Sequence, residues 1–397
     1  MIEDDHPPQP LASTALRVVI APDSFKGSAD AGDVAAAIER GVRAAFATTS
    51  TPVEIDLLPL ADGGEGTLDA IVAAWDAQLH FVDTVDAIGR PVTARYGISP
   101  DGRTAVIEAA DANGLPAVSD VPLQPLAASS LGVGRVLRSV LARGVDEVRL
   151  FIGGSATTDG GAGLLTALGA TLLRRDGTPV PLGGGALGDV ARIDLSGLDP
   201  SARRVRWRIA CDVTNPLVGP EGAAAVFGPQ KGADPDDVAV LDAALARWAD
   251  VLEAEAGTPL RALPGAGAAG GLAVPLVALL GGELEPGWRV VADAVGAASA
   301  LARADAVITG EGRLDAQSLG GKVVSGVREL TPASVPVIVL AGEVALAPDA
   351  VRAARLIAFS IAPGPRSLDE LRAETLDALE RVASSVGSLL AAPSLHS

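Results

Sequence analysis

Apolar runs and helical repeats alternate at the beginning of the chain. RVVIAP at 17–22 is a continuous apolar run, which favours a buried strand. Apolar residues then recur at helical spacing over 34–46, and Ser28 or Asp30 can cap that helix. VEIDLLPL at 53–60 predicts a second strand, which leads through a Gly-rich turn into TLDAIVAAWDA. The chain therefore begins with a β-α-β-α run.

The pattern changes in the middle of the chain and then returns. HFVDTVD, VTARYGI and TAVIEAA are short segments between Gly and Pro turns within 80–108, typical of an antiparallel or mixed sheet. EVRLFIGG and VRWRIACD predict strands that enter polar or Gly-rich loops, and 234–256 predicts a long helix. After residue 290 we expect DAVITG, PVIVLAG and RLIAFS to be strands, with helices over 316–330 and from about Ser367.

Two β-α blocks that flank a different middle predict an α/β protein of two domains. A chain of 397 residues is long enough for two or three domains. We expect a Rossmann-like parallel-sheet domain with a second, mixed α/β domain inserted in it. The predicted boundaries are a disordered tail at 1–15, the Rossmann-like domain at 16–86 and 290–397, and the inserted domain at 87–289.

One uncharged stretch has the length of a membrane span. It is ALPGAGAAGGLAVPLVALLGG at 262–282. Two prolines and six glycines favour a loop followed by a short buried helix, because both residue types disfavour a continuous helix.

Composition and charge narrow the classes of partner and compartment. The formal net charge is −18, and no Lys/Arg run concentrates positive charge, so a nucleic-acid surface is not expected. One cysteine excludes an internal disulfide framework and suits a reducing compartment. The start, MIEDDHPPQPLAST, has no basic or apolar segment of a secretory signal. We therefore expect a cytoplasmic protein without a membrane partner.

The chain offers few histidine or cysteine residues that could be catalytic. Of three histidines, only His80 lies away from the ends, and the alternating segment around it predicts a structural position in a strand. Cys211 follows an apolar strand and has no histidine nearby in the sequence to activate it. Carboxylates, hydroxyls, a few cations and glycine backbone remain, an inventory that suits phosphoryl transfer.

Six Gly-rich loops follow predicted strands or precede predicted helices. Their backbone N–H groups could surround an anion, although each could also be an ordinary turn. GAGAAG at 265–270 matches the dinucleotide pattern G-x-G-x-x-G but follows Leu263 and Pro264 rather than a strand, so it is a weak signal. The loops are APDSFKGS (21–28), ADGGEGT (61–67), GGSATTDGGAG (153–163), the segment 211–233, PGAGAAGG (264–271) and TGEGRLDAQSLGGK (309–322).

All three lysines of this Arg-rich chain lie beside a glycine in these loops: Lys26, Lys231 and Lys322. A lysine is a flexible point charge that can follow a phosphoryl group. The same loops carry many carboxylates, of which Mg²⁺ needs only one or two. A further carboxylate could accept the proton of an attacking hydroxyl. For any one carboxylate, a cap or turn role is as well supported as a functional one.

The loop sequences resemble the signature blocks of the bacterial glycerate kinase family, type I. The matching runs are VIAPDSFKGS, PLADGGEGT, IGGSATTDGGAGLLTALGA, ACDVTNPLVG, FGPQKGA, PGAGAAGG and VITGEGRLDAQSLGGK, in the order of the family and spanning 18–322. The resemblance implies ATP-dependent, Mg²⁺-dependent phosphorylation of D-glycerate on a two-domain α/β fold. Members of this type usually resemble 2-kinases, which produce 2-phosphoglycerate.

With this resemblance we assign roles within an expected inter-domain cleft. Asp212, which ends a strand before a turn, is the predicted base, and Arg313 with Lys26 or Lys322 is expected to hold the glycerate carboxylate. The predicted catalytic residues are Asp212, Lys231 (facing phosphate) and Asp62. The predicted glycerate-binding residues are Asp23, Ser24, Lys26, Arg313, Asp315, Ser318 and Lys322. The predicted ATP-binding residues are Gly63, Gly64, Glu65, Gly154, Ser155, Thr157, Gly160, Gly161, Asn215, Gly267, Gly310 and Glu311. Asp159 is the predicted metal ligand.

Several alternatives stay open at the level of sequence. The β-α alternation and GAGAAG are also compatible with a nicotinamide-dependent dehydrogenase, and a non-catalytic sugar-acid binding protein is a further alternative. The sequence leaves 2- and 3-phosphorylation open, as well as monomer and homodimer.

Overall fold

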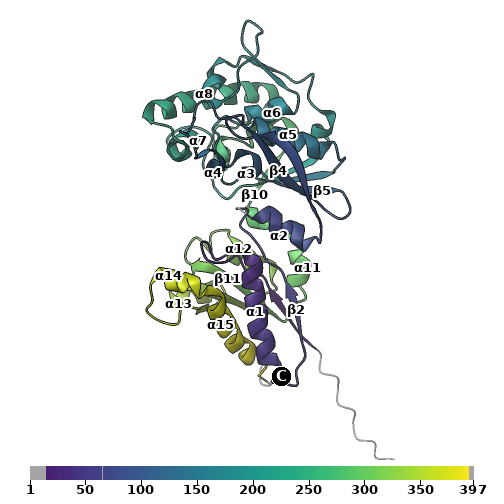
Figure 1. Ribbon diagram of the computed structural model, residues 1–397, viewed down its shortest axis with the longest axis vertical. Coiled ribbons are helices and arrows are strands. Elements are labelled where there is room, and N and C mark those ends of the chain that lie inside the picture. The colour runs from purple at the N-terminus through teal and green to yellow at the C-terminus, as the bar shows by residue number, and fades with distance from the viewer. Residues whose placement is uncertain (1–14, 65, 393–397) are drawn as a thin grey trace, which may run out of the picture. The chain divides into compact units, whose positions relative to one another are not determined.

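The chain folds into two compact α/β units in a computed structural model that describes residues 15–64 and 66–392. The first unit combines the residues up to Leu60 with those from Gly296 onward, and the second is Ala61–Val295. Figure 1 shows the inserted unit in blue to green, the colours of the middle of the chain, whereas the first unit has the colours of the two ends. The predicted class, a parallel-sheet domain with an inserted mixed α/β domain, is confirmed. Except for residue 15, the predicted tail lies outside the described residues.

The first unit is built on a five-stranded parallel sheet of order β13-β12-β11-β1-β2. Val18 in β1 pairs with Ala306 on one side and Ile55 on the other, and β1 is almost completely buried. Parallel strands covered on both faces are continuous apolar runs, as RVVIAP is. The strands are β1 (Leu16–Ile20), β2 (Val53–Leu57), β11 (Ala306–Leu314), β12 (Val337–Val344) and β13 (Leu356–Ser360).

Six helices accompany this sheet within the described residues. Asp30 caps the first, since its carboxylate accepts a hydrogen bond from the Asp33 amide. The helix predicted over 316–330 begins only at Val323, because residues 315–322 form a turn, and the closing helix is divided after Ala373. The helices are α1 (Ala31–Phe46), α11 (Ala297–Leu301), α12 (Val323–Leu330), α13 (Pro348–Ala353), α14 (Leu368–Ala373) and α15 (Thr375–Leu390), and α1 packs along α15 (Figure 1).

The inserted unit contains a six-stranded mixed sheet of order β10-β9-β6-β5-β4-β3. Strands β10, β9, β6 and β5 are parallel, whereas β4 runs antiparallel to both β5 and β3. The expected change to an antiparallel region within 80–108 is thus confirmed. The strands are β3 (Leu79–Val85), β4 (Pro91–Ile98), β5 (Thr104–Glu108), β6 (Glu147–Phe151), β9 (Arg206–Ala210) and β10 (Glu283–Glu285), with a separate hairpin of β7 (Thr171–Leu173) and β8 (Arg192–Asp194).

Helices around this sheet enclose a core that includes the fully buried Trp207 and Trp248. The long helix is confirmed, and Asp234 begins it with a capping box to Asp237. The uncharged stretch 262–282 forms a loop and a short helix, as predicted. The α-helices are α2 (Thr67–Ala74), α3 (Ala110–Asn113), α4 (Leu115–Val118), α5 (Leu131–Leu141), α6 (Ala162–Ala167), α7 (Ala223–Phe227), α8 (Pro235–Ala256), α9 (Val274–Leu280) and α10 (Gly287–Ala294). No helix in residues 15–64 or 66–392 is long and apolar enough to span a bilayer.

The observed division between the units differs from the predicted one at both ends. The inserted unit begins at Ala61 rather than 87, because β3 pairs with β4 and α2 packs on β4 and β5. It ends at Val295 rather than 289, because α10 packs on β9 and α2. The sequence pattern of this first β-α run does not reveal which sheet its last helix covers.

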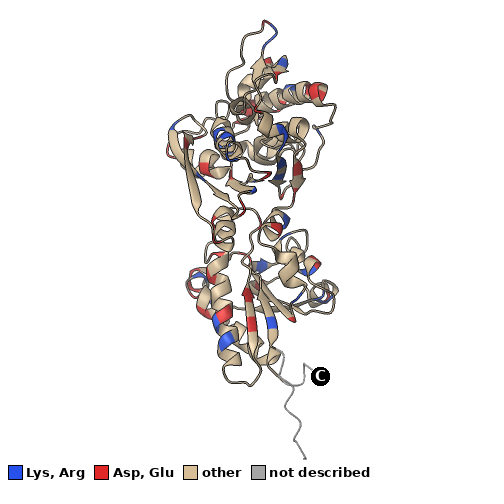
Figure 2. Ribbon diagram, turned by 90° about the vertical axis from the view of Figure 1, so that its right-hand side faces the viewer, with Lys and Arg blue, Asp and Glu red and all other residues tan. Residues whose placement is uncertain are grey.

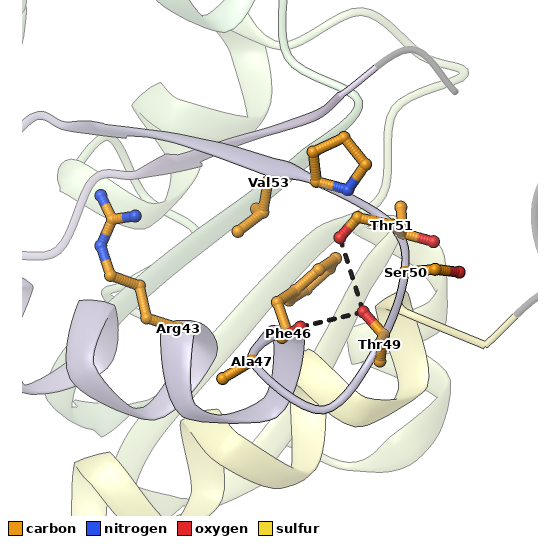
Figure 3. A pocket seen from close by; sticks show the side chains of 8 residues that line it. Arg43, Phe46, Ala47, Thr49, Ser50, Thr51 and Val53 are labelled. Carbon is orange, nitrogen blue, oxygen red and sulfur yellow. Dashed lines mark hydrogen bonds between the residues drawn. The ribbon is translucent and has the colours of Figure 1, made fainter. Parts of the chain in front are cut away.

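A hollow lies at the amino-terminal end of β2, beside the end of α1 (Figure 3). Arg43, Phe46 and Val53 are among its lining residues, and the Thr49 hydroxyl donates to the Phe46 carbonyl at 3.0 Å. In a parallel sheet this end is opposite the carboxyl ends, where ligands usually bind. Figure 2 shows acidic and basic residues interspersed in both units.

Candidate active site

The carboxyl ends of β5, β6, β9 and β10 bring several predicted residues of the inserted unit together. Four parallel strands end at one edge of the sheet, so the loops that follow them are neighbours. The loop after β6 carries Gly154, Ser155 and Thr157, and the loop after β9 carries Asp212. This edge is therefore the candidate site of the inserted unit.

The loop after β6 presents backbone amides at this edge. It is held by the end of α3 and the start of α4: the Leu115 amide donates to the Gly154 carbonyl at 2.9 Å, and the Ala156 amide donates to the Asn113 carbonyl at 2.7 Å. The amides of Gly153, Gly154 and Ser155 donate to no acceptor within the described residues. Since Gly153 and Gly154 are exposed, their N–H groups can receive an anion.

Lys231 lies behind this loop rather than at its exposed face. Its side chain is buried, and its ammonium donates to the Thr157 carbonyl at 2.6 Å and to the Ser155 hydroxyl at 3.1 Å. Burial lowers the pKa of Lys231 to about 8, and the nearby Asp159 only partly opposes that shift. A lysine placed in this way acts on the loop itself.

Asp159 is completely buried and extensively hydrogen-bonded. Its Oδ2 accepts from the Ser130 amide and hydroxyl, both at 2.8 Å, and from the Gly163 amide at 3.2 Å, while its Oδ1 accepts from the Gly161 amide at 3.2 Å. Burial raises the pKa of this carboxyl, and these donors partly counteract the rise. Such contacts fix the start of α6 and suit a structural carboxylate better than a metal ligand, which must leave oxygens for the cation.

Asp62 and Asp212 lie at the same edge, and both adjoin Gly287. The Gly287 amide donates to Asp212 Oδ1 at 2.8 Å. A Cβ added to Gly287 would lie 2.1 Å from the Asp62 carbonyl oxygen and 2.8 Å from Asp212 Oδ2. Asp212 is exposed and Asp62 half-buried. Asp212 therefore holds the first turn of α10 with one oxygen, and its second oxygen adjoins the Asp62 loop.

The loop that contains Asp62 lies against the other predicted loops. A Cβ on Gly63 would approach Gly287 Cα to 3.0 Å and Phe151 Cδ1 to 3.5 Å, and a Cβ on Gly153 would lie 3.8 Å from the Gly63 carbonyl oxygen. The Gly64 amide donates to Asp62 Oδ1 at 3.2 Å. Glu65, also predicted in this loop, lies outside the described residues. Glycine is needed here because the loops approach each other at backbone distance.

Other predicted glycines of the inserted unit support the packing of the loops. A Cβ on Gly161 would lie 2.3 Å from the Leu272 carbonyl oxygen, and one on Gly267 would lie 2.2 Å from the Pro216 carbonyl oxygen. The Gly267 amide donates to the Asn215 carbonyl at 3.0 Å. The Gly160 carbonyl accepts the indole N–H of Trp248 at 2.8 Å. GAGAAG at 265–270 does not join a strand to an α-helix, so it lacks the context of a dinucleotide fingerprint.

The first unit has its own group of predicted residues, at the point where its strand order reverses. The strands β1 and β11 are neighbours, but the chain continues from β1 to β2 towards one edge of the sheet and from β11 to β12 towards the other. Open α/β sheets bind ligands at such a switch point. The Asp23 amide donates to the Gly310 carbonyl at 2.8 Å, so the loop after β1 adjoins the middle of β11. The Ser24 amide in turn donates to Asp23 Oδ1 at 2.7 Å.

Glu311 occupies the centre of this group. Burial raises its carboxyl pKa to about 7, Ser318 opposes the rise by hydrogen bonding, and the negative Asp23 adds to it. Glu311 Oε1 is buried and has no hydrogen-bond partner within residues 15–64 and 66–392. A carboxyl in this state can change protonation near neutral pH.

Cationic residues accompany Glu311 in this group, and the positive Lys322 partly opposes the rise of its pKa. Arg313 is exposed, with its Nε 3.5 Å from Glu343 and 3.7 Å from Asp315, and the Lys322 ammonium donates to Gln317 Oε1 at 3.3 Å. The Lys26 backbone lies against β11, since its nitrogen would be 3.9 Å from a Cβ on Gly312. These positions suit recognition of an anionic ligand.

The geometry also bears on metal binding. Among the described residues, no three His, Cys, Asp or Glu side chains lie close enough to form a metal cluster. Mg²⁺ takes much of its coordination from water and phosphate and requires one or two carboxylates. The accessible Asp62 and Asp212, on adjoining loops, fit that requirement, whereas the saturated Asp159 does not.

Comparison with known proteins decides the family. The model described as "Glycerate kinase family" matches residues 18–391. The chain belongs to the glycerate kinase family. It is 43% identical over 375 residues to the glycerate kinase of Bacillus subtilis (strain 168), covering 94% of this chain and 97% of that protein. It is 40% identical over 378 residues to the glycerate 2-kinase of Escherichia coli (strain K12), covering 95% and 98%.

A solved structure extends the family likeness to three dimensions. The crystal structure of a protein provisionally named glycerate kinase 2 from Salmonella typhimurium LT2 is 42% identical to this chain. It aligns with a TM-score of 0.84 and covers 95% of this chain and 98% of the other. The arrangement of elements described above is thus that of a glycerate kinase family member.

The residues set aside on sequence grounds occupy structural positions. His80 lies in β3 and stacks on Tyr96, with ring centroids 5.2 Å apart. Cys211 is half-buried, its thiol donates to the Val213 carbonyl at 3.3 Å, and burial raises the pKa of the thiol.

Sequence reasoning missed two residues at the edge of the inserted sheet, Glu108 and Asn113. Glu108 ends β5, accepts the Leu68 amide at the start of α2 at 2.8 Å, and has a pKa raised by burial to about 7. The Asn113 side-chain amide donates to the Thr157 hydroxyl at 2.9 Å. Their position just after an apolar run, TAVIEAADAN, was the signal that could have identified them.

Proposed function

We propose that this protein transfers the γ-phosphoryl group of ATP to the 2-hydroxyl of D-glycerate and releases 2-phosphoglycerate and ADP. The observation that carries the proposal is its identity of 40–43%, over nearly its whole length, to proteins named glycerate kinase or glycerate 2-kinase. The single cysteine excludes an internal disulfide, which supports a reducing, cytoplasmic location.

The Gly-rich loops of the inserted unit are the proposed phosphate site. The outward amides of Gly153 and Gly154, with the adjoining Gly63 and Gly64, support this assignment. Mg²⁺, when bound with ATP, would neutralise phosphate charge, and Asp62 is the proposed protein ligand. Asp62 is preferred to Asp159 because only Asp62 is both accessible and at the shared edge of the loops.

Asp212 is the proposed general base. Its Oδ1 is fixed by the Gly287 amide, while Oδ2 can accept the proton of the glycerate hydroxyl as the oxygen attacks the γ-phosphorus. The bond from the γ-phosphorus to the bridging oxygen breaks, and ADP leaves with that electron pair. A carboxylate on a fixed loop needs no histidine to fulfil this role.

The group at the switch point of the first unit is the proposed glycerate site. Arg313, with Lys26 or Lys322, would pair with the substrate carboxylate. Asp23, Ser24, Asp315 and Ser318 supply oxygens around the hydroxyls of the substrate. The exposed guanidinium and the sheet position of this group support the assignment.

The decisive experiment is phosphorus NMR of the product formed from ATP, Mg²⁺ and D-glycerate. We expect 2-phosphoglycerate, and ATP consumption that depends on glycerate. A product phosphorylated at the 3-position would refute the regiochemistry, and failure to consume ATP would refute the kinase assignment. Removal of Mg²⁺ with EDTA should abolish turnover, and excess Mg²⁺ should restore it.

A further inference from the structure

The buried ammonium of Lys231 has no role in the chemistry proposed above, although its surroundings are specific. It donates to the Thr157 carbonyl and the Ser155 hydroxyl, two groups of the loop whose exposed amides form the proposed phosphate site. In the sequence, Lys231 lies 74 positions after Thr157 and 76 positions after Ser155, so these contacts join distant segments of the chain. Lys231 is 3% exposed, so the protein encloses a cation at a cost that requires a compensating gain.

Asn113 braces the same loop from another element. Its side-chain amide donates to the Thr157 hydroxyl at 2.9 Å, and its carbonyl accepts the Ala156 amide at 2.7 Å. Ser155, Thr157 and Asn113 are all nearly completely buried. Thr157 is therefore held by its carbonyl and its hydroxyl from two separate segments of the chain.

These contacts orient the loop in a definite way. The Gly154 and Thr157 carbonyls are turned inward to partners in the protein, whereas the Gly153 and Gly154 amides are at the exposed side. If the inward carbonyls lost their partners, the peptide groups would be free to rotate, and a carbonyl dipole facing a phosphate would repel it.

We propose that Lys231 is a positioning residue for ATP: it holds the Gly153–Thr158 loop, assisted by Asn113, so that the backbone amides and not its own ammonium receive the phosphates. This inference rests on the proposed function, since it takes ATP as the ligand. In this proposal Lys231 acts on ATP through the loop, whereas in the alternative its ammonium contacts a phosphate directly. The two alternatives predict different results.

The primary test is steady-state kinetics of Lys231→Met, which keeps the length of the side chain and removes the hydrogen bonds. We expect KM for ATP to rise at least tenfold and KM for glycerate to stay within twofold, with the melting temperature within a few degrees of wild type. A lysine with only a structural role would change the melting temperature and leave KM for ATP within twofold, which would overturn the proposal.

Two smaller changes separate positioning from direct phosphate contact and leave the lysine in place. Thr157→Val removes the hydroxyl that Asn113 holds, and Ser155→Ala removes the hydroxyl that Lys231 holds. Each should raise KM for ATP several-fold. The control Thr158→Val removes a neighbouring buried hydroxyl without a hydrogen-bond partner among the described residues, and should leave KM for ATP unchanged. The proposal fails if Thr157→Val has no more effect than Thr158→Val. If Lys231→Met does not fold, these variants still test the positioning role.

Labelling of lysines with an amine-reactive reagent, followed by mass spectrometry, provides an independent criterion. Lys231 should remain unlabelled with and without ATP, while Lys26 is labelled. Labelling of Lys231 that ATP suppresses would indicate direct contact and overturn the proposal. Calorimetric titration with ATP alone keeps the two hypotheses distinguishable: wild type that binds ATP but does not phosphorylate glycerate refutes the proposed function, whereas equal ATP affinity of wild type and Lys231→Met refutes the positioning role.

Discussion

At the scale of single residues, Asp212 combines a structural and a proposed chemical contact. Asp212→Asn keeps an oxygen that can accept the Gly287 amide, so the first turn of α10 should remain intact. It loses the ability to take a proton, and we expect kcat to fall at least a hundredfold while ATP affinity changes little. Steady-state kinetics with calorimetric ATP binding measures both. The matched control is Asp377→Asn, which changes an exposed carboxylate on α15 and should alter neither kcat nor ATP affinity.

Lys231 should also leave a signature in the dependence of stability on pH. Its pKa is lowered from 10.5 to about 8 in the folded protein, so between these values the unfolded chain binds more protons. The free energy of unfolding should therefore rise with pH across this window, by at most about 3 kcal/mol from this group. Urea unfolding at pH 7.5 and 9.5 measures the rise, which Lys231→Met should lack. An identical pH dependence in both proteins would contradict the buried, cationic state of Lys231.

At the scale of elements, α1 and α15 approach each other closely at Gly41. A Cβ added there would lie 2.3 Å from the Glu380 carbonyl oxygen and 2.8 Å from the Ser384 nitrogen, so the helices would have to separate. Gly41→Ala should lower the free energy of unfolding by about 1–3 kcal/mol, despite the better helix propensity of alanine. Gly32→Ala, at an exposed position of the same helix, should be neutral or stabilising. Thermal unfolding of both variants tests this contrast.

The accuracy of the predicted elements follows from how local their signals are. Asp30 and Asp234 begin helices because a carboxylate can accept the amide N–H groups of the first turn, an interaction within three residues. The helix predicted over 316–330 begins late because Asp315 and Ser318 stabilise a turn, with the Asp315 amide donating to the Ser318 hydroxyl at 3.0 Å. The spacing of apolar residues does not show that a side-chain hydrogen bond favours a turn over the first part of the helix.

At the scale of the whole molecule, the inserted unit has a core of its own, and its two ends are tied together. The indole N–H of Trp75, which directly follows α2, donates to the Ala294 carbonyl of α10 at 2.8 Å. We therefore expect residues 61–295, expressed alone, to fold and to unfold cooperatively by circular dichroism. The fragment should lack kinase activity, because it lacks the group around Glu311.

The predicted boundaries provide the control for that experiment. Fragment 87–289 lacks α2, β3 and most of α10. In it β4 loses one of its two antiparallel partners, and the sheet loses part of its cover. It should be markedly less stable than 61–295 or insoluble. Equal stability of the two fragments would contradict the observed division of the chain.

The sequence by itself determined the succession of strands and helices and the membership of a family, because apolar periodicity, capping residues and loop motifs are properties of neighbouring positions. It also identified the loops that meet at the two sheet edges, since parallel strands end together. Only the tertiary structure decided that Lys231 is enclosed behind a loop, that Asp159 is saturated by four hydrogen bonds, and that β3 belongs to the inserted unit. Burial and pKa depend on groups that lie far away along the chain, and no local pattern encodes their distance.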